Sequence, residues 1–237
     1  MCGLVGFASN EVLDNPTFVL DRMLSKIVKR GPDGQGIWLD SSNRVAFGHT
    51  RLSLVDLSSN GDQPMASTCG RYVIIFNGEI YNFRKLRRII NYPWKSNSDT
   101  ETILGALVCF GLERTLEILD GMFAFVLYDK QLKQLTLVRD RTGEKPLYFS
   151  TKNGALIFSS DLSAISLHPS QKKEICLDAV DAYLVHGYVP APASIYRGVK
   201  KLLPGHLIKY SLENGVLESR AYWELSEPDN DYSEQSQ

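Results

Sequence analysis

Apolar and polar positions along the chain predict short strands that gather in runs, with helices between the runs. One run lies before residue 56 and another lies between residues 122 and 159. Because strands and helices do not alternate regularly, the pattern favours an α+β fold with largely antiparallel sheets over a doubly wound one. The predicted strands are Leu4–Ala8, Gly36–Leu39, Arg44–Phe47, Leu52–Val55, Arg71–Glu79, Met122–Tyr128, Gln134–Arg139, Leu147–Ser150 and Ala155–Ser159.

Helices are predicted where apolar residues recur every three or four positions behind a capping residue. In the segment Asn15–Arg30 the apolar residues share one face, with Asn15 as the cap and Pro16 at the first helical position. The other predicted helices are one capped by Asn82, Thr100–Phe110 capped by Ser98 or Asp99 and ended by Gly111, and Leu177–His186 ended by Gly187.

Asn-Gly pairs indicate sharp turns between strands. Asn153-Gly154 stands between two predicted strands, which is typical of a two-residue hairpin. Asn214-Gly215 indicates a further hairpin, and Asn77-Gly78 follows a strongly apolar run. We therefore expect a tight turn at Asn77-Gly78 as well.

Composition and charge limit the function. The chain has 237 residues, of which 43% are hydrophobic and 22% charged, as in ordinary globular proteins. At this size folding would bury roughly 72% of the surface of the unfolded chain, so the core needs no disulfide or metal. The formal net charge of −1 argues against a surface that tracks phosphates, and no nucleic-acid partner is expected.

The sequence carries no membrane or secretion signal. No stretch approaches the roughly 20 apolar residues of a membrane helix, and no basic segment precedes the apolar N-terminus. Cys2, Cys69, Cys109 and Cys176 are scattered without zinc-finger spacing, so neither a disulfide framework nor a zinc site is expected. We expect a cytoplasmic protein with no membrane partner.

Residues 1–186 are predicted to form one domain, and the composition changes from Gly187 onward. Pro190, Pro192 and Pro204 lie close together there, and the tail 226–237 is too polar to be ordered alone. We expect residues 187–237 to be a connector that leads away from the finished domain.

Cys2 is the first candidate for catalysis. Small residues at this position generally permit removal of Met1, which would give Cys2 both a thiol and a free α-amine. An α-amine has a pKa of about 7.7–8.0 and a thiol of about 8.5, so moving the proton from sulfur to nitrogen costs only about 1 kcal/mol. Such an amine suits the role of general base for a nucleophile. Taken alone, Cys2 could equally be a small residue entering a strand.

Other residues could complete a site that cleaves an amide, and each has an ordinary structural alternative. The Asn77 carboxamide and the Gly78 N–H could stabilise an oxyanion, or they could form a plain hairpin turn. Arg51 could clamp a carboxylate or form a structural ion pair. Asp99 could bind an ammonium group or cap a helix. We expect His49 to be a structural histidine, because the α-amine already fills the role of base.

Motifs along the chain together resemble the glutaminase domain of glutamine-dependent asparagine synthetase, a class II amidotransferase. RGPDG is typical of the asparagine synthetase branch of that class. The similarity is dense from Cys2 to about Ser160 and continues through YLVHGYVPAPASIYRGVKKLLPGH. The motifs are, in chain order, MCGLVGF, RGPDGQG, GHTRLSLVDLSSNGDQPM, FNGEIYN, SDTETIL, LDGMFAFVLYD and RDRTGEKPLYF.

The resemblance implies an α+β fold of the N-terminal nucleophile (Ntn) hydrolase type, a four-layer αββα sandwich with two antiparallel sheets. It implies that Cys2 is the nucleophile with its own α-amine as base, and that Asn77 and Gly78 form the oxyanion hole. It also implies that Arg51 binds the α-carboxylate of the substrate, L-glutamine. The residues that the resemblance expects around the rest of the substrate are Leu52, Ser53, Leu54, Val55, Asn77, Gly78, Glu79 and Asp99.

The resemblance also implies partners outside this chain. The family's ATP-binding SGG-x-DS loop has no counterpart here, so we expect a synthetase domain in cis in a longer protein, where ATP and Mg are used. It would amidate aspartate or a related carboxylate. No metal or organic cofactor is expected for the glutaminase reaction, and a homodimer is allowed. The alternatives are an Ntn amidase acting on a non-glutamine amide, and a non-catalytic interaction domain if Met1 stays attached.

Overall fold

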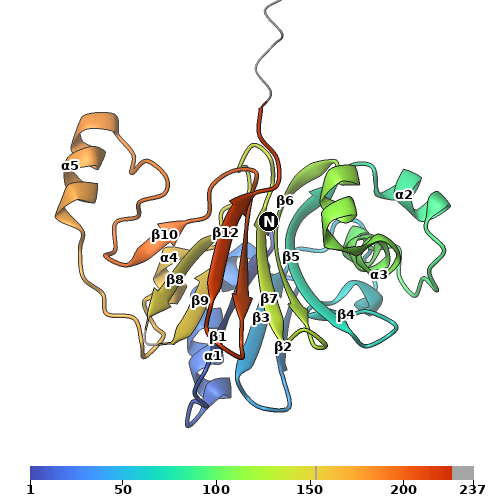
Figure 1. The fold of residues 1–237 in the computed structure, drawn as a ribbon, viewed down its shortest axis with the longest axis horizontal. Helices are drawn as coiled ribbons and strands as arrows, with labels where there is room; N and C mark the ends of the chain where they lie inside the picture. The colour runs from blue at the N-terminus through green and yellow to red at the C-terminus, as the bar shows by residue number, and fades with distance from the viewer. Residues whose placement is uncertain (153, 226–237) are drawn as a thin grey trace, which may run out of the picture.

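Two six-stranded antiparallel sheets packed face to face form the centre of the computed structural model, which describes residues 1–152 and 154–225 (Figure 1). From edge to edge, sheet A consists of β10 (Val199–Lys201), β8 (Tyr148–Lys152), β9 (Ala155–Ser159), β1 (Gly3–Ser9), β3 (Val45–Arg51) and β2 (Gly34–Leu39). Sheet B consists of β12 (Leu217–Ala221), β11 (His206–Ser211), β7 (Gln134–Arg139), β6 (Gly121–Asp129), β5 (Tyr72–Ile80) and β4 (Met65–Ala66).

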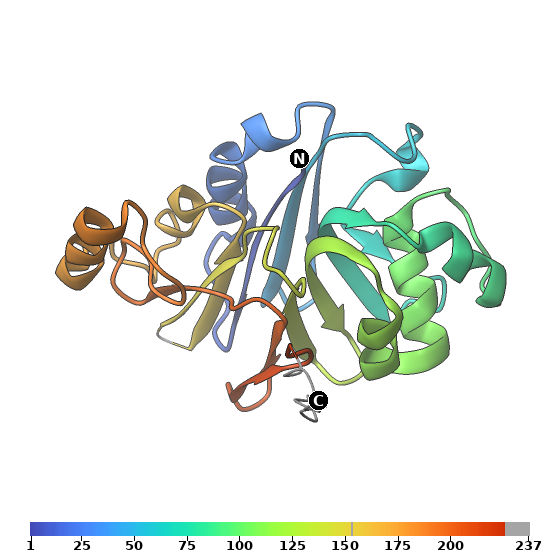
Figure 2. The ribbon, with the colours of Figure 1, turned by 90° about the horizontal axis from the view of Figure 1, so that it is seen from above.

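Helices cover the outer face of each sheet, which gives the four layers of an αββα sandwich (Figure 2). On sheet A lie α1 (Pro16–Ser25) and α4 (Leu162–Ile165), and on sheet B lie α2 (Phe83–Ile89) and α3 (Asp99–Ile118). α5 (Leu177–His186) projects to one side of the sandwich (Figure 1). Short 3-10 turns span Val28–Arg30 and Ser59–Gly61.

Side chains alternate between the two faces of each strand, and this alternation sorts the core into layers. Leu4, Phe47 and Ile75 belong to the cluster between the sheets. Phe7 packs with α1 on the other face of sheet A, and Phe76 packs with α3 on the other face of sheet B. Continued to the strand ends, the alternation places polar residues on the inner faces where the apolar core stops, namely Cys2, His49, Arg51, Asn77 and Glu79.

Local signals predicted several element ends correctly. The Asn15 side chain accepts a hydrogen bond from the Phe18 amide at 3.0 Å, and Pro16 is the first residue of α1. α5 has the predicted bounds and ends at Gly187, whose φ of 76° is left-handed. The first helix ends at Ser25, before the predicted Arg30, and the chain then forms the 3-10 turn Val28–Arg30.

Several local predictions differ from the structure. Asn77-Gly78 is not a turn, because both residues lie inside β5 and pair with β6. Leu52–Val55 is a loop rather than a strand. The predicted end at Gly111 is a break with φ 74° in the middle of α3, which continues to Ile118. Asn82 precedes α2 as expected, but its side chain donates to the Ile118 carbonyl at 2.8 Å instead of capping the helix.

The segment after Gly187 differs from the expected connector. β10 extends sheet A beside β8, while β11 and β12 extend sheet B. Leu202 and Ile208 are buried between the sheets, so the sheets do not end at residue 186. The hairpin at Asn214-Gly215 is confirmed by the pairing of β11 with β12. The predictions for Asn153 and for the tail 226–237 lie outside the described residues.

Candidate active site

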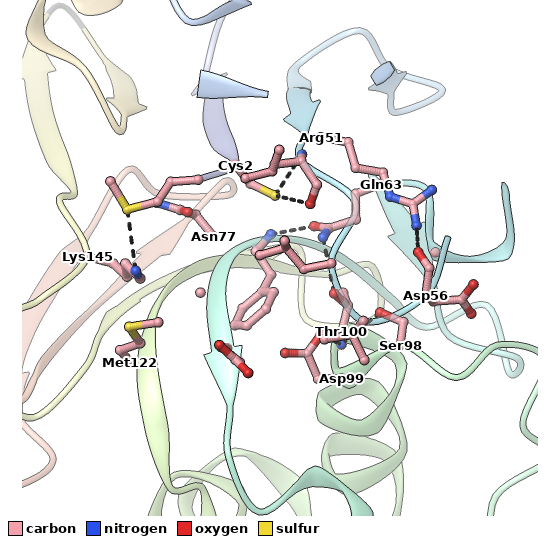
Figure 3. A pocket seen from close by; sticks show the side chains of 18 residues that line it. Cys2, Arg51, Asp56, Gln63, Asn77, Ser98, Asp99, Thr100, Met122 and Lys145 are labelled. Carbon is pink, nitrogen blue, oxygen red and sulfur yellow. Dashed lines mark hydrogen bonds between the residues drawn. The ribbon is translucent and has the colours of Figure 1, made fainter. Parts of the chain in front are cut away.

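A cavity of about 100 Å³ lies at the end of the sandwich where the inner faces of β1, β3 and β5 carry polar residues (Figure 3). Its lining comes from the start of β1, the end of β3, the loop between β3 and β4, β5 and the first turn of α3. Met122 of β6 and Lys145 complete it. The cavity therefore collects segments that are far apart in the sequence.

Cys2 contributes a thiol to this cavity, directly before β1. The Leu52 amide nitrogen lies 3.4 Å from Cys2 Sγ, and the Leu52 carbonyl oxygen lies 3.7 Å from it. Burial raises the pKa of the Cys2 thiol, and the hydrogen bond from the Leu52 backbone opposes this only partly. The thiol therefore keeps its proton near neutral pH, and a base has to remove that proton before the sulfur can attack.

Met1 precedes Cys2 in the structure, so the Cys2 nitrogen belongs to a peptide bond. The Met1 side chain lines the cavity, and its Sδ lies 3.4 Å from Lys145 Nζ. Arg30 Nε donates to the Cys2 carbonyl oxygen at 3.2 Å, which fixes the backbone beside the thiol. Removal of Met1 would free an α-amine on Cys2 itself and vacate part of the cavity.

Asn77 offers an unused hydrogen-bond donor to the cavity. The residue is 1% exposed, and its Nδ2 has no hydrogen-bond partner among the described residues. Buried polar groups are almost always paired. An unpaired amide that lines the same cavity as a thiol is therefore available to a ligand.

The Gly78 N–H faces the open edge of β5. Successive residues of a strand direct their backbone groups to opposite edges. The amides of Phe76 and Ile80 donate to the side chains of Gln63 (2.6 Å) and Asp99 (3.0 Å) instead of to β6. Gly78 is two residues from each of them, so its N–H faces the same edge of β5. No side chain in the described part of the chain accepts from this N–H. Asn77 and Gly78 thus supply adjacent donors.

Arg51 lies at the end of β3, and the loop that follows holds its guanidinium group. Arg51 Nη1 donates to Asp62 Oδ1 at 2.6 Å and to the Ser58 carbonyl at 2.8 Å, and Nη2 donates to the Asp56 carbonyl. These contacts use three of the five N–H donors of the side chain. The Nε–H and one Nη2 N–H have no partner in the part of the chain that the structure describes, so they can receive a carboxylate.

Asp99 is the first residue of α3 and is 5% exposed. Its two carboxylate oxygens accept from the amides of Ile80 and Thr100, each at 3.0 Å. Burial raises the pKa of Asp99 to about 6, which these hydrogen bonds only partly offset. Glu79 lines the same cavity, so two carboxylates are present to bind a cation such as an ammonium group.

The family model of the glutamine amidotransferase domain matches residues 1–223. The chain belongs to this family. A putative glutamine-hydrolysing asparagine synthetase 2 of Methanocaldococcus jannaschii is 33% identical in an alignment 245 residues long that covers 95% of this chain and 47% of that protein. The glutamine-hydrolysing asparagine synthetase 3 of Bacillus subtilis is 33% identical over 232 residues, covering 95% and 37%. The chain thus spans less than half the length of these relatives.

The solved structure of the glutamine phosphoribosylpyrophosphate amidotransferase of B. subtilis has the same fold. It superposes with a TM-score of 0.70 at 16% identity, and the match covers 94% of this amidotransferase domain and 49% of that chain. Identity at this level is evidence for the fold alone. With the two antiparallel sheets, it confirms the predicted Ntn hydrolase sandwich.

The structure brings nearly all the predicted site residues of this amidotransferase domain together. Ser53 is the exception, since it does not line the cavity and its amide donates to Asp33 Oδ2 at 2.8 Å. The roles assigned to the others stay predictions. The predicted residues that line the cavity are Cys2, Arg51, Leu52, Leu54, Val55, Asn77, Gly78, Glu79 and Asp99.

Gln63 is a residue of the site that the sequence analysis did not single out. Its Oε1 accepts from the Phe76 amide at 2.6 Å, and its Nε2 donates to Thr100 Oγ1 at 3.1 Å, so it joins β5 to α3. The partners lie 13 and 37 residues away, and no local signal marks such a residue. Lys145 and Met122 were missed for the same reason. Among the described residues, no cluster of His, Cys, Asp and Glu could hold a metal ion, and no helix is both long and apolar enough to cross a bilayer.

Proposed function

We propose that this chain hydrolyses L-glutamine to glutamate and ammonia, as the glutaminase part of a glutamine-dependent asparagine synthetase. The observation that carries the proposal is that the Cys2 thiol and the unpaired Asn77 amide line one cavity. The family match and the asparagine synthetase relatives support it.

Arg51 and Asp99 hold the amino-acid end of the substrate in this proposal. The two unused N–H groups of Arg51 bind the α-carboxylate of glutamine, and Asp99 with Glu79 binds its α-ammonium group. Fixing this end directs the side-chain amide of glutamine toward Cys2. The reaction then no longer depends on a chance encounter of sulfur and carbon.

The reaction passes through a thioester on Cys2. After removal of Met1, the α-amine of Cys2 takes the proton of the thiol, and the thiolate attacks the amide carbon. Asn77 Nδ2 and the Gly78 N–H donate to the oxyanion that forms. Collapse breaks the carbon–nitrogen bond, and the N-terminal ammonium protonates the leaving nitrogen, which departs as ammonia. Water, deprotonated by the same amine, then hydrolyses the thioester to glutamate and restores the thiol.

The ammonia is used in a synthetase domain that follows in the parent protein. That domain would use ATP and Mg to activate aspartate or a related carboxylate, while the glutaminase reaction needs no metal or organic cofactor. The support is that the chain covers 47% and 37% of two relatives named as glutamine-hydrolysing asparagine synthetases.

The test is release of glutamate from L-glutamine by purified protein whose intact mass shows that Met1 is gone. We expect turnover by the wild type and by Cys69→Ala, a control at an exposed cysteine outside the cavity, and none by Cys2→Ala. Glutamate release by Cys2→Ala at the wild-type rate would refute the mechanism. If glutamine is inert while another amide releases ammonia, the substrate assignment is wrong.

A further inference from the structure

His49 is a polar residue on the inner face of β3, two residues before Arg51. It is fully buried, and its Nε2 lies 3.0 Å from the Phe76 carbonyl oxygen on β5. The hydrogen bond therefore crosses from sheet A to sheet B at the level of the cavity. Apolar neighbours on the same face of β3, such as Phe47, bridge the sheets by packing alone.

The chemistry of the two partners fixes the tautomer of His49. A carbonyl oxygen only accepts, so Nε2 carries the proton and Nδ1 is a bare acceptor. This Nδ1 is buried and has no partner among the described residues. Burial also lowers the pKa of His49 to about 4, so the ring is a neutral donor at physiological pH. A buried unpaired acceptor is unfavourable for folding, so stability alone does not explain a histidine here.

The carbonyl that His49 holds belongs to the peptide group that joins Phe76 to Asn77. The Phe76 amide is held in turn by Gln63 Oε1 at 2.6 Å, and the Ile80 amide is held by Asp99 Oδ2 at 3.0 Å. Side chains thus bind the open edge of β5 on both sides of Gly78. The direction of the Asn77 side chain and of the Gly78 N–H depends on the orientation of these peptide groups.

We infer that His49 is a positioning residue that fixes the Phe76–Asn77 peptide group and thereby aims the oxyanion donors Asn77 and Gly78 at the reacting carbon. This inference rests on the proposed glutaminase function. His49 does not line the cavity, and it acts only through its contact with β5. Without this hydrogen bond the peptide group is held only on its β6 side, where Asn77 pairs with Ala124, so it can tilt and the two donors diverge. This weakens binding of the transition state more than binding of glutamine.

Gln and Asn form a matched pair of substitutions for the test. In His49→Gln the amide nitrogen stands as many bonds from the backbone as Nε2 of histidine, so it can donate to the Phe76 carbonyl. In His49→Asn the same amide is one bond shorter and cannot reach. We expect His49→Asn to lower kcat about 10- to 100-fold with KM within about threefold, and His49→Gln to keep most of the wild-type kcat.

A second measurement separates positioning from a general structural role. An aldehyde analogue of glutamine adds to the Cys2 thiol and gives a tetrahedral oxygen in the place of the oxyanion. Its inhibition constant should rise in His49→Asn by the same factor by which kcat/KM falls, while KM for glutamine hardly moves. If His49→Asn does not fold, His49→Leu takes its place. Its melting temperature should change little, since the unpaired Phe76 carbonyl replaces the unpaired Nδ1.

The outcomes distinguish this inference from the proposed function. If the wild type hydrolyses glutamine and His49→Asn or His49→Leu keeps its kcat within twofold, the positioning role is wrong. The role is also wrong if kcat falls while the inhibition constant of the aldehyde stays unchanged. If the processed wild type does not hydrolyse glutamine at all, the proposed function itself fails, irrespective of His49.

Discussion

Replacing Asp99 by asparagine should make the protein more stable and weaken its binding of glutamine. Burial holds the pKa of Asp99 at about 6, above the ordinary value of 3.8. Because the folded carboxyl group binds its proton more tightly than the unfolded one, stability falls as pH rises from 3.8 to 6 and stays reduced above pH 6. A shift of about 2 pKa units corresponds to roughly 3 kcal/mol of lost stability at neutral pH.

Asparagine removes this cost and keeps most of the hydrogen bonds. Its Oδ1 can accept from the Ile80 amide, and the Thr100 amide keeps Ser98 Oγ as acceptor at 3.1 Å. Allowing about 1 kcal/mol for the weakened contacts, the free energy of unfolding should rise by roughly 2 kcal/mol at pH 7.5. Urea unfolding at pH 7.5 measures this change.

Glutamine binding should change in the opposite direction. Calorimetry in a Cys2→Ala background, where no turnover occurs, should show a Kd about 30- to 100-fold higher after Asp99→Asn, because the α-ammonium group loses a buried carboxylate. With Asp99 present, Kd should rise about tenfold between pH 7 and pH 5, since only about a tenth of the carboxyl groups are ionised at pH 5. With asparagine this part of the pH dependence disappears.

Glu101→Gln is the matched control, because it removes the same charge from the same helical turn outside the cavity. Glu101 accepts from the amides of Lys95 and Ser96 and lies 3.7 Å from Arg87, so this variant should lose stability and bind glutamine normally. If Asp99→Asn is less stable than the wild type, the sign of the burial effect is wrong. Unchanged glutamine binding would show that Asp99 does not hold the ammonium group.

Three further substitutions test the rest of the domain. Arg51→Lys keeps the charge but loses the planar fork, so KM for glutamine should rise about 10- to 100-fold in steady-state kinetics, and an unchanged KM contradicts the anchoring role. Asn77→Ala should lower kcat about 100- to 1,000-fold with little change in KM. An equal loss in Leu57→Ala, a control at an exposed loop residue outside the cavity, would mean that the loss is not specific to Asn77. His168 is buried against Phe7 on the outer face of sheet A. Burial lowers its pKa to about 4, so the free energy of unfolding falls by up to roughly 3 kcal/mol as pH falls from 6.5 to 4. Urea unfolding at pH 7 and pH 4.5 should show a smaller loss for His168→Leu, and equal losses would exclude His168 as the cause.

Patterns within a few residues predicted the scaffold well. Asn15 and Gly187 marked helix ends because capping depends on neighbouring backbone groups. The turn predicted at Asn77-Gly78 is absent because the apolar residues around this pair belong to one strand. Its partner strand, β6, begins 43 residues after Gly78.

Long-range contacts account for the remaining differences. β10 lies in the proline-rich segment, and its pairing with β8 makes it a strand. The hairpin of β11 and β12 was indicated by Asn214-Gly215, but its place in sheet B depends on pairing with β7. The roles proposed for Cys2 and Asn77 come from motifs, whereas their proximity comes from the packing of the two sheets. Gln63 and the bridge from His49 to Phe76 could not be predicted, because each depends on which backbone groups an incomplete strand edge leaves unpaired.

The shortness of β4 has a consequence for how this enzyme can evolve. β4 pairs with β5 only at Met65↔Ile74 and Ala66↔Val73. If the strand continued in that register, Gly61 would come to lie opposite Gly78. A backbone carbonyl of the longer strand would then accept from the Gly78 N–H, which the proposed mechanism uses to bind the oxyanion. Insertions or substitutions that straighten the chain before Met65 would therefore abolish the proposed activity while Cys2, Asn77 and Gly78 are all unchanged.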